Sequence, residues 1–192
     1  GAQLKRLGVP GEAEFEHRGV SQCADCDGPM CQNEDVVVVG GGDSALQEAL
    51  VLAHFCKRVH LVHRGGTFSA RQSLVDAVKA QPKIEVHFNT VVEAIEGEQM
   101  VSKVRVKGAD GKSAELAAIG FFAYVGLAPN TACVPAEVQR DAGGRLVADG
   151  HQTALAGLFA AGVVRSGCGG DLIDAQNDGA AAAAAAAKFL GR

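Results

Sequence analysis

The 192-residue sequence lacks three features that mark common functional classes. Its 18 basic and 22 acidic residues are scattered, so it has no positive patch for nucleic acid or for an anionic membrane surface. Its longest low-polarity stretch, the alanines 180–187, is too short to span a bilayer. No leader of basic and then apolar residues opens it. We therefore expect a globular cytoplasmic protein with no nucleic-acid and no membrane partner.

The sequence is also poor in cysteine, with six residues in 192. This density excludes a small domain stapled by disulfides, because 47% of the residues are hydrophobic and can build an ordinary core. The length suits one ordinary domain or two small ones. In a reducing compartment a close cysteine pair is more often catalytic or metal-binding, and Cys23 and Cys26 form such a pair.

Apolar patterning predicts an α/β fold. The unbroken valines 36–39 are typical of a strand that is buried on both faces of a parallel sheet. In the first part of the chain, strands are expected at 36–39, 58–63, 84–89, 101–106 and 113–118, and helices at 44–56 and 69–79. Further on we expect strands at 120–126 and 157–162, a turn at 129–130, and a closely packed alanine-rich helix at 175–190.

A glycine-rich turn joins the first of these strands to the first helix. Gly40-Gly41-Gly42-Asp43-Ser44-Ala45 matches the pattern G-x-G-x-x-A, with the strand before it and the helix after it that a dinucleotide site requires. The glycines permit a tight turn and a close approach of the pyrophosphate, which then faces the helix N-terminus. We therefore predict a dinucleotide site at residues 40–45.

The end of the second strand bears on which dinucleotide binds. An acidic residue there would pair with the ribose hydroxyls of NAD, whereas this chain has His63-Arg64. A cation suits the 2′-phosphate of NADP, so NADP(H) is favoured.

The spacing of Cys23 and Cys26 allows a small disulfide loop. Closing so short a loop removes little chain entropy, on the order of 2 kcal/mol, so a redox switch suits the pair better than a structural staple. Asp27 is a candidate proton donor or acceptor for the thiols. The alternative is a metal clamp with Cys31, but no second close ligand pair exists, and we predict no metal site.

Seven segments of the sequence together resemble one enzyme family, the low-molecular-weight thioredoxin reductases and their relatives, such as the flavoprotein of alkyl hydroperoxide reductase. The matching segments are Leu7–Glu12, Cys23–Gly28, Gly40–Ala45, His63-Arg64, Val125–Thr131, Gly157–Gly162 and Asp178–Ala180. The resemblance implies a flow of electrons from NADPH to FAD, then to the dithiol and on to a protein disulfide such as that of thioredoxin. It also implies a homodimer.

The resemblance assigns roles to individual residues. Cys26 matches the cysteine that meets the flavin, Cys23 the one that attacks the partner, and Asp27 the acid. Glu48 matches the second of two glutamates after the glycine turn. Gly126 and Gly162 match cofactor-binding positions.

The resemblance also completes the expected domain plan. The fold class is a Rossmann-like NAD(P)-binding domain with a parallel sheet, plus the C-terminal segment of a second, FAD-type domain. We expect residues 1–19 to be a linker at the end of a first FAD segment, 20–119 the NAD(P)-binding domain and 120–192 the second FAD segment.

The sequence departs from the family's pattern at three places. Val163 stands where the family has an aspartate that contacts the flavin's ribityl-diphosphate region, and Gly170-Asp171 stand near its Arg-Gln pair. With the first FAD segment expected to be missing, these changes argue against FAD binding. The family's His-Arg-Arg signature is thinned to His63-Arg64-Gly65, with Arg71 as a candidate second cation, so NADH also stays open.

Two alternatives to a thioredoxin reductase remain. One is a flavin-free NAD(P)-binding module in which the cysteine pair senses redox state. The other is a reductase of the same type whose substrate is a peroxiredoxin or a small dithiol.

Overall fold

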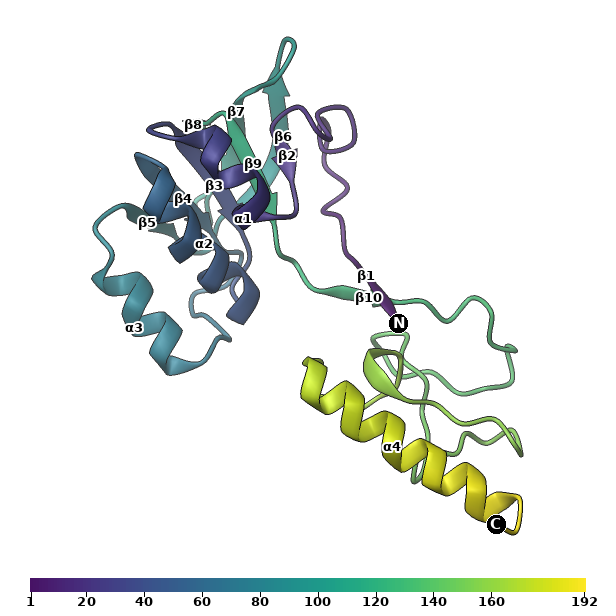
Figure 1. The fold of residues 1–192 in the computed structure, drawn as a ribbon. Helices are drawn as coiled ribbons and strands as arrows, with labels where there is room; N and C mark the ends of the chain where they lie inside the picture. Colours follow the sequence, from purple (N-terminus) through teal and green to yellow (C-terminus); the bar gives the residue numbers. More distant parts are fainter. The chain divides into compact units, whose positions relative to one another are not determined.

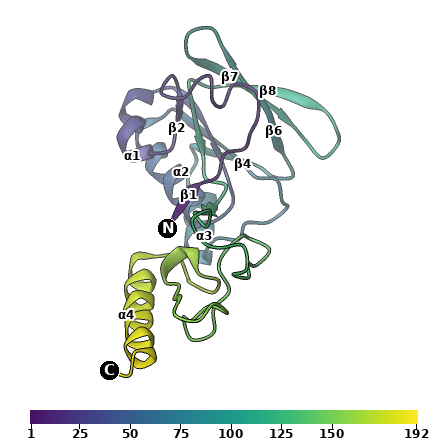
Figure 2. The same ribbon diagram turned by 90° about the vertical axis from the view of Figure 1, so that its right-hand side faces the viewer.

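The computed structural model describes residues 1–192, which divide into two compact units. The larger unit comprises residues 5–125, and the smaller comprises residues 1–4 with residues 126–192. Figures 1 and 2 show both units, and each is described by itself.

A five-stranded parallel sheet forms the centre of the larger unit (Figure 1). Its strand order is β2 (Val20–Ser21), β9 (Gly120–Ala123), β3 (Asp35–Val39), β4 (Arg58–Val62) and β5 (Ile84–His87). The valines of β3 are buried on both faces, as their unbroken apolar run predicts. The parallel order confirms the predicted Rossmann-like sheet.

Three helices cover one face of this sheet. They are α1 (Ala24–Asp27), which continues into the 3-10 turn η1 (Gly28–Cys31), α2 (Asp43–Phe55) and α3 (Gln72–Ala80). Their apolar sides join Val36 and Val38 of β3 in one buried core, in which Leu46 and Leu52 of α2 are fully enclosed. Each side chain of this size stabilises the fold by about 1.5–3 kcal/mol when it leaves water.

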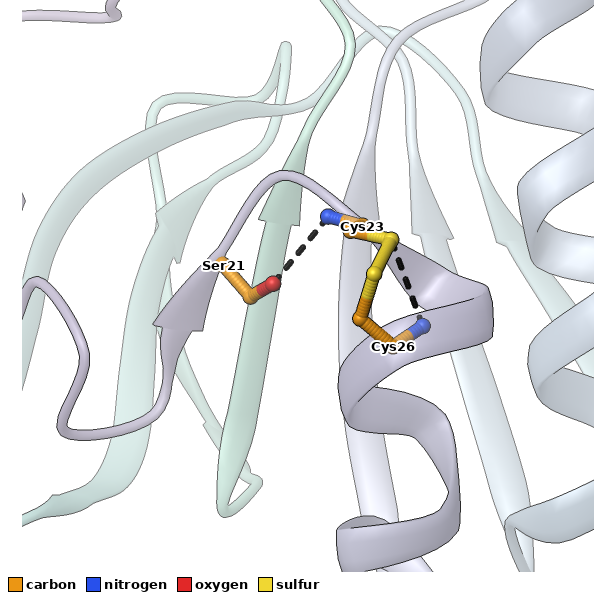
Figure 3. Close-up of a disulfide and its surroundings, with 3 residues drawn as sticks. All are labelled: Ser21, Cys23 and Cys26. Atoms are coloured by element: carbon orange, nitrogen blue, oxygen red, sulfur yellow. Dashed lines mark hydrogen bonds between the residues drawn. A yellow bond between two sulfur atoms is a disulfide. The ribbon is translucent and has the colours of Figure 1, made fainter.

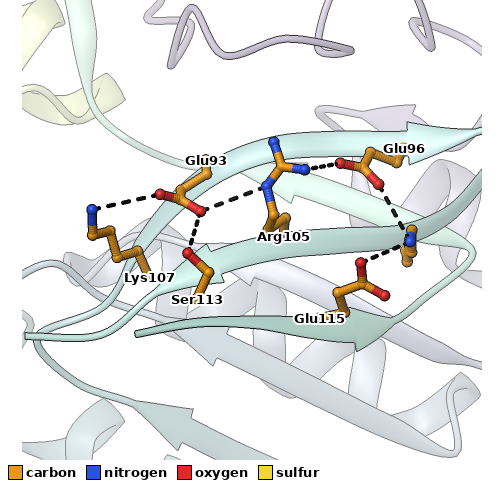
Figure 4. Close-up of polar contacts among 7 residues, drawn as sticks. Glu93, Glu96, Arg105, Lys107, Ser113 and Glu115 are labelled. Atoms are coloured by element: carbon orange, nitrogen blue, oxygen red, sulfur yellow. Dashed lines mark hydrogen bonds and ion pairs between the residues drawn. The ribbon is translucent and has the colours of Figure 1, made fainter. Parts of the chain in front are cut away.

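An antiparallel sheet of three strands covers the opposite face. It consists of β6 (Val91–Gly97), β7 (Val101–Lys107) and β8 (Ser113–Ala117). Its inner side packs Ile95 and Val104 against Val37 and Phe121 of the parallel sheet. Figure 4 shows the polar side of this sheet, where Arg105 pairs with Glu93 and Glu96. Alternating inner apolar and outer charged residues therefore fix the register of the three strands.

The segment before the cysteine pair is held by a buried carboxylate. Glu12 is only 6% exposed and accepts hydrogen bonds from the backbone N–H groups of Leu7, at 3.0 Å, and Gly8, at 2.7 Å. The motif Leu7–Glu12 thus has a structural role in forming this loop.

The smaller unit contains little regular structure besides one long helix. Strand β1 (Ala2–Leu4) pairs antiparallel with β10 (Leu127–Pro129), and a 3-10 turn, η2 (Gly162–Val164), precedes α4 (Leu172–Phe189). Arg165 donates to the carboxylate of Asp178 through Nε, at 2.8 Å, and through Nη2. This ion pair joins η2 to α4.

The structure corrects several element predictions. No strand forms at 157–162, where Gly157 and Gly162 have left-handed φ values and only Phe159 makes an isolated bridge. The predicted turn at 129–130 overlaps β10, which ends at Pro129, and β6 was not predicted. The alanine-rich helix is present as α4. The prediction that it packs closely was wrong, because only Asp178 and Ala182 are buried in it.

The compact units do not coincide with the expected domains. Strand β9 hydrogen-bonds to β2 and β3 within the larger unit, although its residues were assigned to the second FAD segment. Units defined by contacts need not match functional domains, so the domain boundaries at 19/20 and 119/120 stay a prediction. None of the helices combines the length and apolar character needed to cross a membrane.

Candidate functional site

Cys23 and Cys26 are joined by a disulfide at the start of α1 (Figure 3). The backbone N–H of Cys23 donates to Ser21 Oγ at 3.1 Å, and the N–H of Cys26 donates to Cys23 Sγ at 3.2 Å. Cys26 is exposed and Cys23 is half-buried. The disulfide is therefore accessible to a reductant, while the hydrogen bond that Cys23 donates to Ser21 Oγ fixes the backbone on one side of it.

The remaining cysteines do not complete a metal clamp with this pair. Cys31 lies in the helix-side core, where a Cβ at Gly120 would stand 3.0 Å from its Sγ. Burial, and then the negative charge of Asp27, raises the pKa of the Cys31 thiol. The two sulfurs of the disulfide are bonded to each other, so Cys23, Cys26 and Cys31 form no set of thiolate ligands here.

The glycine turn is shaped by close contacts at two positions. Gly40 has φ +150°, and a Cβ there would lie 2.6 Å from the Cβ of Ala45 and would overlap the backbone oxygen of Tyr124. A Cβ at Gly41 would overlap the ring of His63, with Nε2 at 2.7 Å. The turn therefore requires glycine at 40, and a side chain at 41 would have to displace the ring of His63.

The N-terminus of α2 is open toward solvent. Gly42 is its N-cap residue and makes no side-chain cap, and a Cβ built on Gly42 would have only Ser69 Oγ near it, at 3.9 Å. The structure gives no hydrogen-bond acceptor to the N–H groups of Asp43, Ser44 and Ala45. These unpaired donors at the start of a 13-residue helix fit a phosphate group.

Of the two predicted cationic residues beside the turn, one has an ion-pair partner and the other has none. Arg64 is exposed and makes no hydrogen bond or ion pair. Arg71 instead pairs through Nε with Asp43 at 2.6 Å, and its N–H donates to the same carboxylate at 2.7 Å. Arg64 is therefore the unpaired cation at this end of the site.

A small aromatic group stands at the end of β4. The ring of His63 lies 5.6 Å from Phe68 and 6.3 Å from Phe88, between ring centroids. Ser69, from the same loop, donates through its N–H to the oxygen of Gly41 at 2.8 Å. The loop 63–69 is thus tied to the glycine turn by a link that the sequence pattern did not indicate.

Glu48 lies between the dithiol helix and the end of β9. Burial, and then the charge of Asp25, raises the pKa of its carboxyl group, which lies near the backbone of Ala24. The buried hydroxyl of Tyr124 lies beside it without a hydrogen bond of ordinary geometry. Burial, and then the charge of Glu48, raises the pKa of Tyr124. Sequence reasoning missed Tyr124, since nothing in its pattern distinguishes it from a strand residue.

The structure brings most of the predicted site residues into one unit and leaves two in the other. The residues of the larger unit are Cys23, Cys26, Asp27, Gly40, Gly41, Gly42, Asp43, Ser44, Ala45, Glu48, His63, Arg64 and Arg71. Gly126 and Gly162 belong to the smaller unit. The N–H of Gly162 already donates to Asp178 at 2.7 Å.

Comparison with known proteins relates this arrangement to one family. The model of the family described as pyridine nucleotide-disulphide oxidoreductase matches residues 1–188. The thioredoxin reductases of Treponema pallidum and Dictyostelium discoideum are 42% and 38% identical to 99% of this chain. The chain spans 62% and 61% of their lengths.

Solved structures give the same result. Lactococcus lactis thioredoxin reductase, in a form described as the FR conformation, matches 98% of this chain with a TM-score of 0.92 and 37% identity. The thioredoxin reductase of T. acidophilum matches 100% with a TM-score of 0.92 and 31% identity. This chain covers 63% and 64% of those two chains. By sequence and by fold, the chain belongs to the pyridine nucleotide-disulphide oxidoreductase family.

Proposed function

We propose that this chain is the nucleotide-and-dithiol portion of an NAD(P)H-dependent disulfide reductase of the thioredoxin reductase type. The observation that carries the proposal is the juxtaposition of its two chemical parts. Ala24, which lies between the disulfide cysteines, and Ala45, which ends the glycine motif, are both fully buried in the same core. The dithiol helix and the helix that faces the phosphates therefore form one rigid body.

The nucleotide is held by the glycine turn and its neighbours. The unpaired N–H groups of Asp43, Ser44 and Ala45 bind the pyrophosphate, and Arg64 binds the 2′-phosphate of NADP(H). Arg64 is the cation without a partner, while Arg71 is a second candidate whose exposed pair with Asp43 is weak enough to open. Because Gly65 follows His63-Arg64 in place of a second adjacent arginine, the preference for NADPH over NADH is weak.

The net chemistry is a two-electron reduction. One NAD(P)H and one proton reduce the Cys23–Cys26 disulfide to two thiols, which then reduce an external disulfide and reform their own. Cys23 attacks the external disulfide, Cys26 resolves the mixed disulfide and accepts the incoming electrons, and Asp27 exchanges the protons. The half-buried Asp27 directly follows Cys26, which supports this last role.

The external disulfide belongs to a thioredoxin-type protein, a proposal supported by the relatives of Treponema pallidum and Dictyostelium discoideum, which are named thioredoxin reductases. A homodimer in the cytoplasm completes the proposal. A peroxiredoxin or a small dithiol is the alternative substrate. No contact surface of this chain favours either of them over a thioredoxin.

The residues that would hold a flavin in this chain do not fit it. Val163 offers no hydrogen-bond acceptor, and the Gly162 N–H is occupied by Asp178. At the start of α4, Asp171 caps the helix by accepting from the N–H of Asp174 at 2.7 Å.

That misfit favours a second candidate function, a flavin-free NAD(P)-binding module whose disulfide reports redox state. The two candidates are distinguished by colour. Purified protein with bound flavin is yellow, and the redox-sensing module is colourless with or without the sequence that accompanies it in the complete protein.

Nucleotide binding and turnover test the leading proposal. Calorimetric titration with NADPH and NADH should show that Arg64→Gln removes the preference for NADPH, while the matched control Arg192→Gln keeps it. In the complete protein, Cys23→Ser and Cys26→Ser should each abolish thioredoxin reduction, while Cys133→Ser, a change at an exposed thiol, should not. Equal loss from all three serine variants would refute the assigned roles.

A further inference from the structure

Two histidines and a glutamate converge on the outermost strands of the parallel sheet. His60 and Glu85 are directly opposite each other on β4 and β5, and His87 is opposite Val62. Opposite residues in neighbouring strands share a face, as do residues two apart, so all three side chains lie on one face. This group is outside the dithiol and nucleotide residues described above.

The distances among these side chains match those between the ligands of one metal ion. His60 Nδ1 lies 3.0 Å from His87 Nε2 and 3.8 Å from a Glu85 oxygen, and His87 Nε2 lies 3.7 Å from the other oxygen. Ligand bonds of about 2.0–2.1 Å in a tetrahedron place neighbouring ligand atoms about 3.3 Å apart. The observed separations lie within about 0.5 Å of that value. The two ring nitrogens, which share a hydrogen bond without an ion, would move slightly apart, and the 51% exposed Glu85 side chain would close the two longer gaps.

The chemistry of the three groups selects a class of metal. Two imidazoles and one carboxylate suit zinc and its neighbours in the transition series, whereas Mg²⁺ and Ca²⁺ prefer sites made of oxygen ligands. Three protein ligands leave the fourth position of a tetrahedron for water. His60 is 5% exposed, so its ring is held in place by the surrounding protein.

A carboxylate on the next strand, β3, lies on the same face of the sheet as this cluster. Asp35 lies two residues before Val37, the residue opposite His60, so its side chain is on the same face. Its Oδ1 is buried and has no hydrogen-bond partner. Histidines that bind metals commonly have a carboxylate behind them. Arg58 also pairs with Glu85, at 3.3 Å. Both side chains are about half exposed, and such surface ion pairs contribute little to stability, so this pair leaves Glu85 free to bind an ion.

We propose that His60, Glu85 and His87 bind one divalent transition-metal ion of the zinc class, with Asp35 as supporting carboxylate and water as the fourth ligand. The ion links β4 to the edge strand β5. It also acts next to the nucleotide site, because the backbone oxygen of His87 accepts from the N–H of His63 at 2.9 Å. The sequence concealed this site, since its ligands come from two strands and form no recognisable motif.

Calorimetry on the chelator-treated chain tests the proposal, with Cys23 and Cys26 kept oxidised so that they cannot bind metal. Titration with ZnCl₂ should show one site per chain, and titration with MgCl₂ should show none. His87→Gln should weaken Zn²⁺ binding by more than about 100-fold, because even second-shell partners of metal-binding histidines contribute 10- to 100-fold. The exposed His54 on α2 provides the matched control, and His54→Gln should leave the affinity unchanged.

A second variant guards against a folding defect. Glu85→Gln changes an exposed side chain and should weaken Zn²⁺ binding while the circular dichroism spectrum stays that of the wild type. Binding of Co²⁺ to the wild type should give the intense visible absorption of a tetrahedral site. This absorption should be absent in His87→Gln and in Glu85→Gln. Zn²⁺ affinity that is undetectable, that is unchanged by His87→Gln and Glu85→Gln, or that falls equally in His54→Gln would overturn the proposal.

Discussion

The imidazole of His63 lies over Gly41 so closely that a methyl group at position 41 would overlap it, with Nε2 at 2.7 Å. His63 is also hydrogen-bonded through Nε2 to the oxygen of Thr67, at 3.0 Å. The end of β4 therefore rests directly on the glycine turn. A substitution at Gly41 would therefore shift the His63 ring directly, because no other side chain lies between them.

This contact predicts different outcomes for neighbouring glycines. Gly41→Ala should displace His63 and destabilise the fold by about 1–3 kcal/mol, the usual cost of overpacking. Gly42→Ala should fold with nearly normal stability, because its methyl group enters open space, yet it should weaken NADPH binding by occupying the approach of the phosphates. Urea unfolding and calorimetric NADPH titration measure the two effects. Unaltered NADPH affinity in Gly42→Ala would place the nucleotide elsewhere.

The buried carboxylate of Glu12 predicts a stability effect far from the chemistry. Its two charge-assisted hydrogen bonds to Leu7 and Gly8 should make Glu12→Ala less stable by about 2–4 kcal/mol. The exposed Glu14 is the control, and Glu14→Ala should change stability by less than about 0.5 kcal/mol. Denaturant midpoints measure both variants, and similar midpoints would show that the loop is not held by Glu12.

The free thiols should differ strongly in reactivity. Burial, and then the charge of Cys31, raises the pKa of Cys56 to about 12. At pH 8 about one Cys56 in 10,000 would be ionised, and thiolate is the reactive form. Exposed Cys133 should therefore be alkylated by iodoacetamide before Cys31 and Cys56. Peptide mass spectrometry over time distinguishes this order from uniform labelling, which would indicate that the core opens readily.

Asp178 should control the acid stability of the smaller unit. The hydrogen bond from Arg165 holds the pKa of the Asp178 carboxyl below its usual range. A depressed pKa stabilises the fold above the unfolded pKa of about 3.9, and this contribution is lost as the pH falls through the folded pKa. Asp178→Asn should be less stable at pH 7 by about 2 kcal/mol and should lose less stability on acidification.

The acid profile needs a carboxylate that lacks the ion pair as its control. Asp76→Asn, on the exposed side of α3, should retain the wild-type dependence on pH. Urea unfolding at several pH values between about 3 and 7 gives the comparison. If the Asp178→Asn curve fell as steeply as that of the wild type, the Arg165–Asp178 pair would not be the source of acid sensitivity.

Sequence patterns predicted those parts of the fold that depend on interactions between residues close in the sequence. The valines of β3, the glycine turn and α2 were found because strand, turn and helix have short-range signatures within about thirty residues. Strand β6 was missed because its bulges at Val92–Ala94 and Glu96–Gly97 interrupt the alternation of apolar residues.

Other features depend on contacts between distant residues. The absence of a strand at 157–162 follows from pairing, because Phe159 forms one isolated bridge, with Gln152, and no sheet includes this segment. The pairing of Arg71 with Asp43, 28 residues away, is a contact that no local pattern reveals. The cluster of His60, Glu85 and His87 likewise exists only once β4 and β5 are paired. Sequence patterns therefore located the elements and the motifs, but not which side chains remain free to act.

The most direct test of the proposed function follows the redox state of the cysteine pair. The complete protein, with its other thiols blocked, is treated with NADPH, and thiols are then labelled and assigned by mass spectrometry. Labelling of both Cys23 and Cys26, with one NADPH consumed per disulfide, is the predicted result. A pair that stays disulfide-bonded while a chemical dithiol reduces it readily would contradict the account.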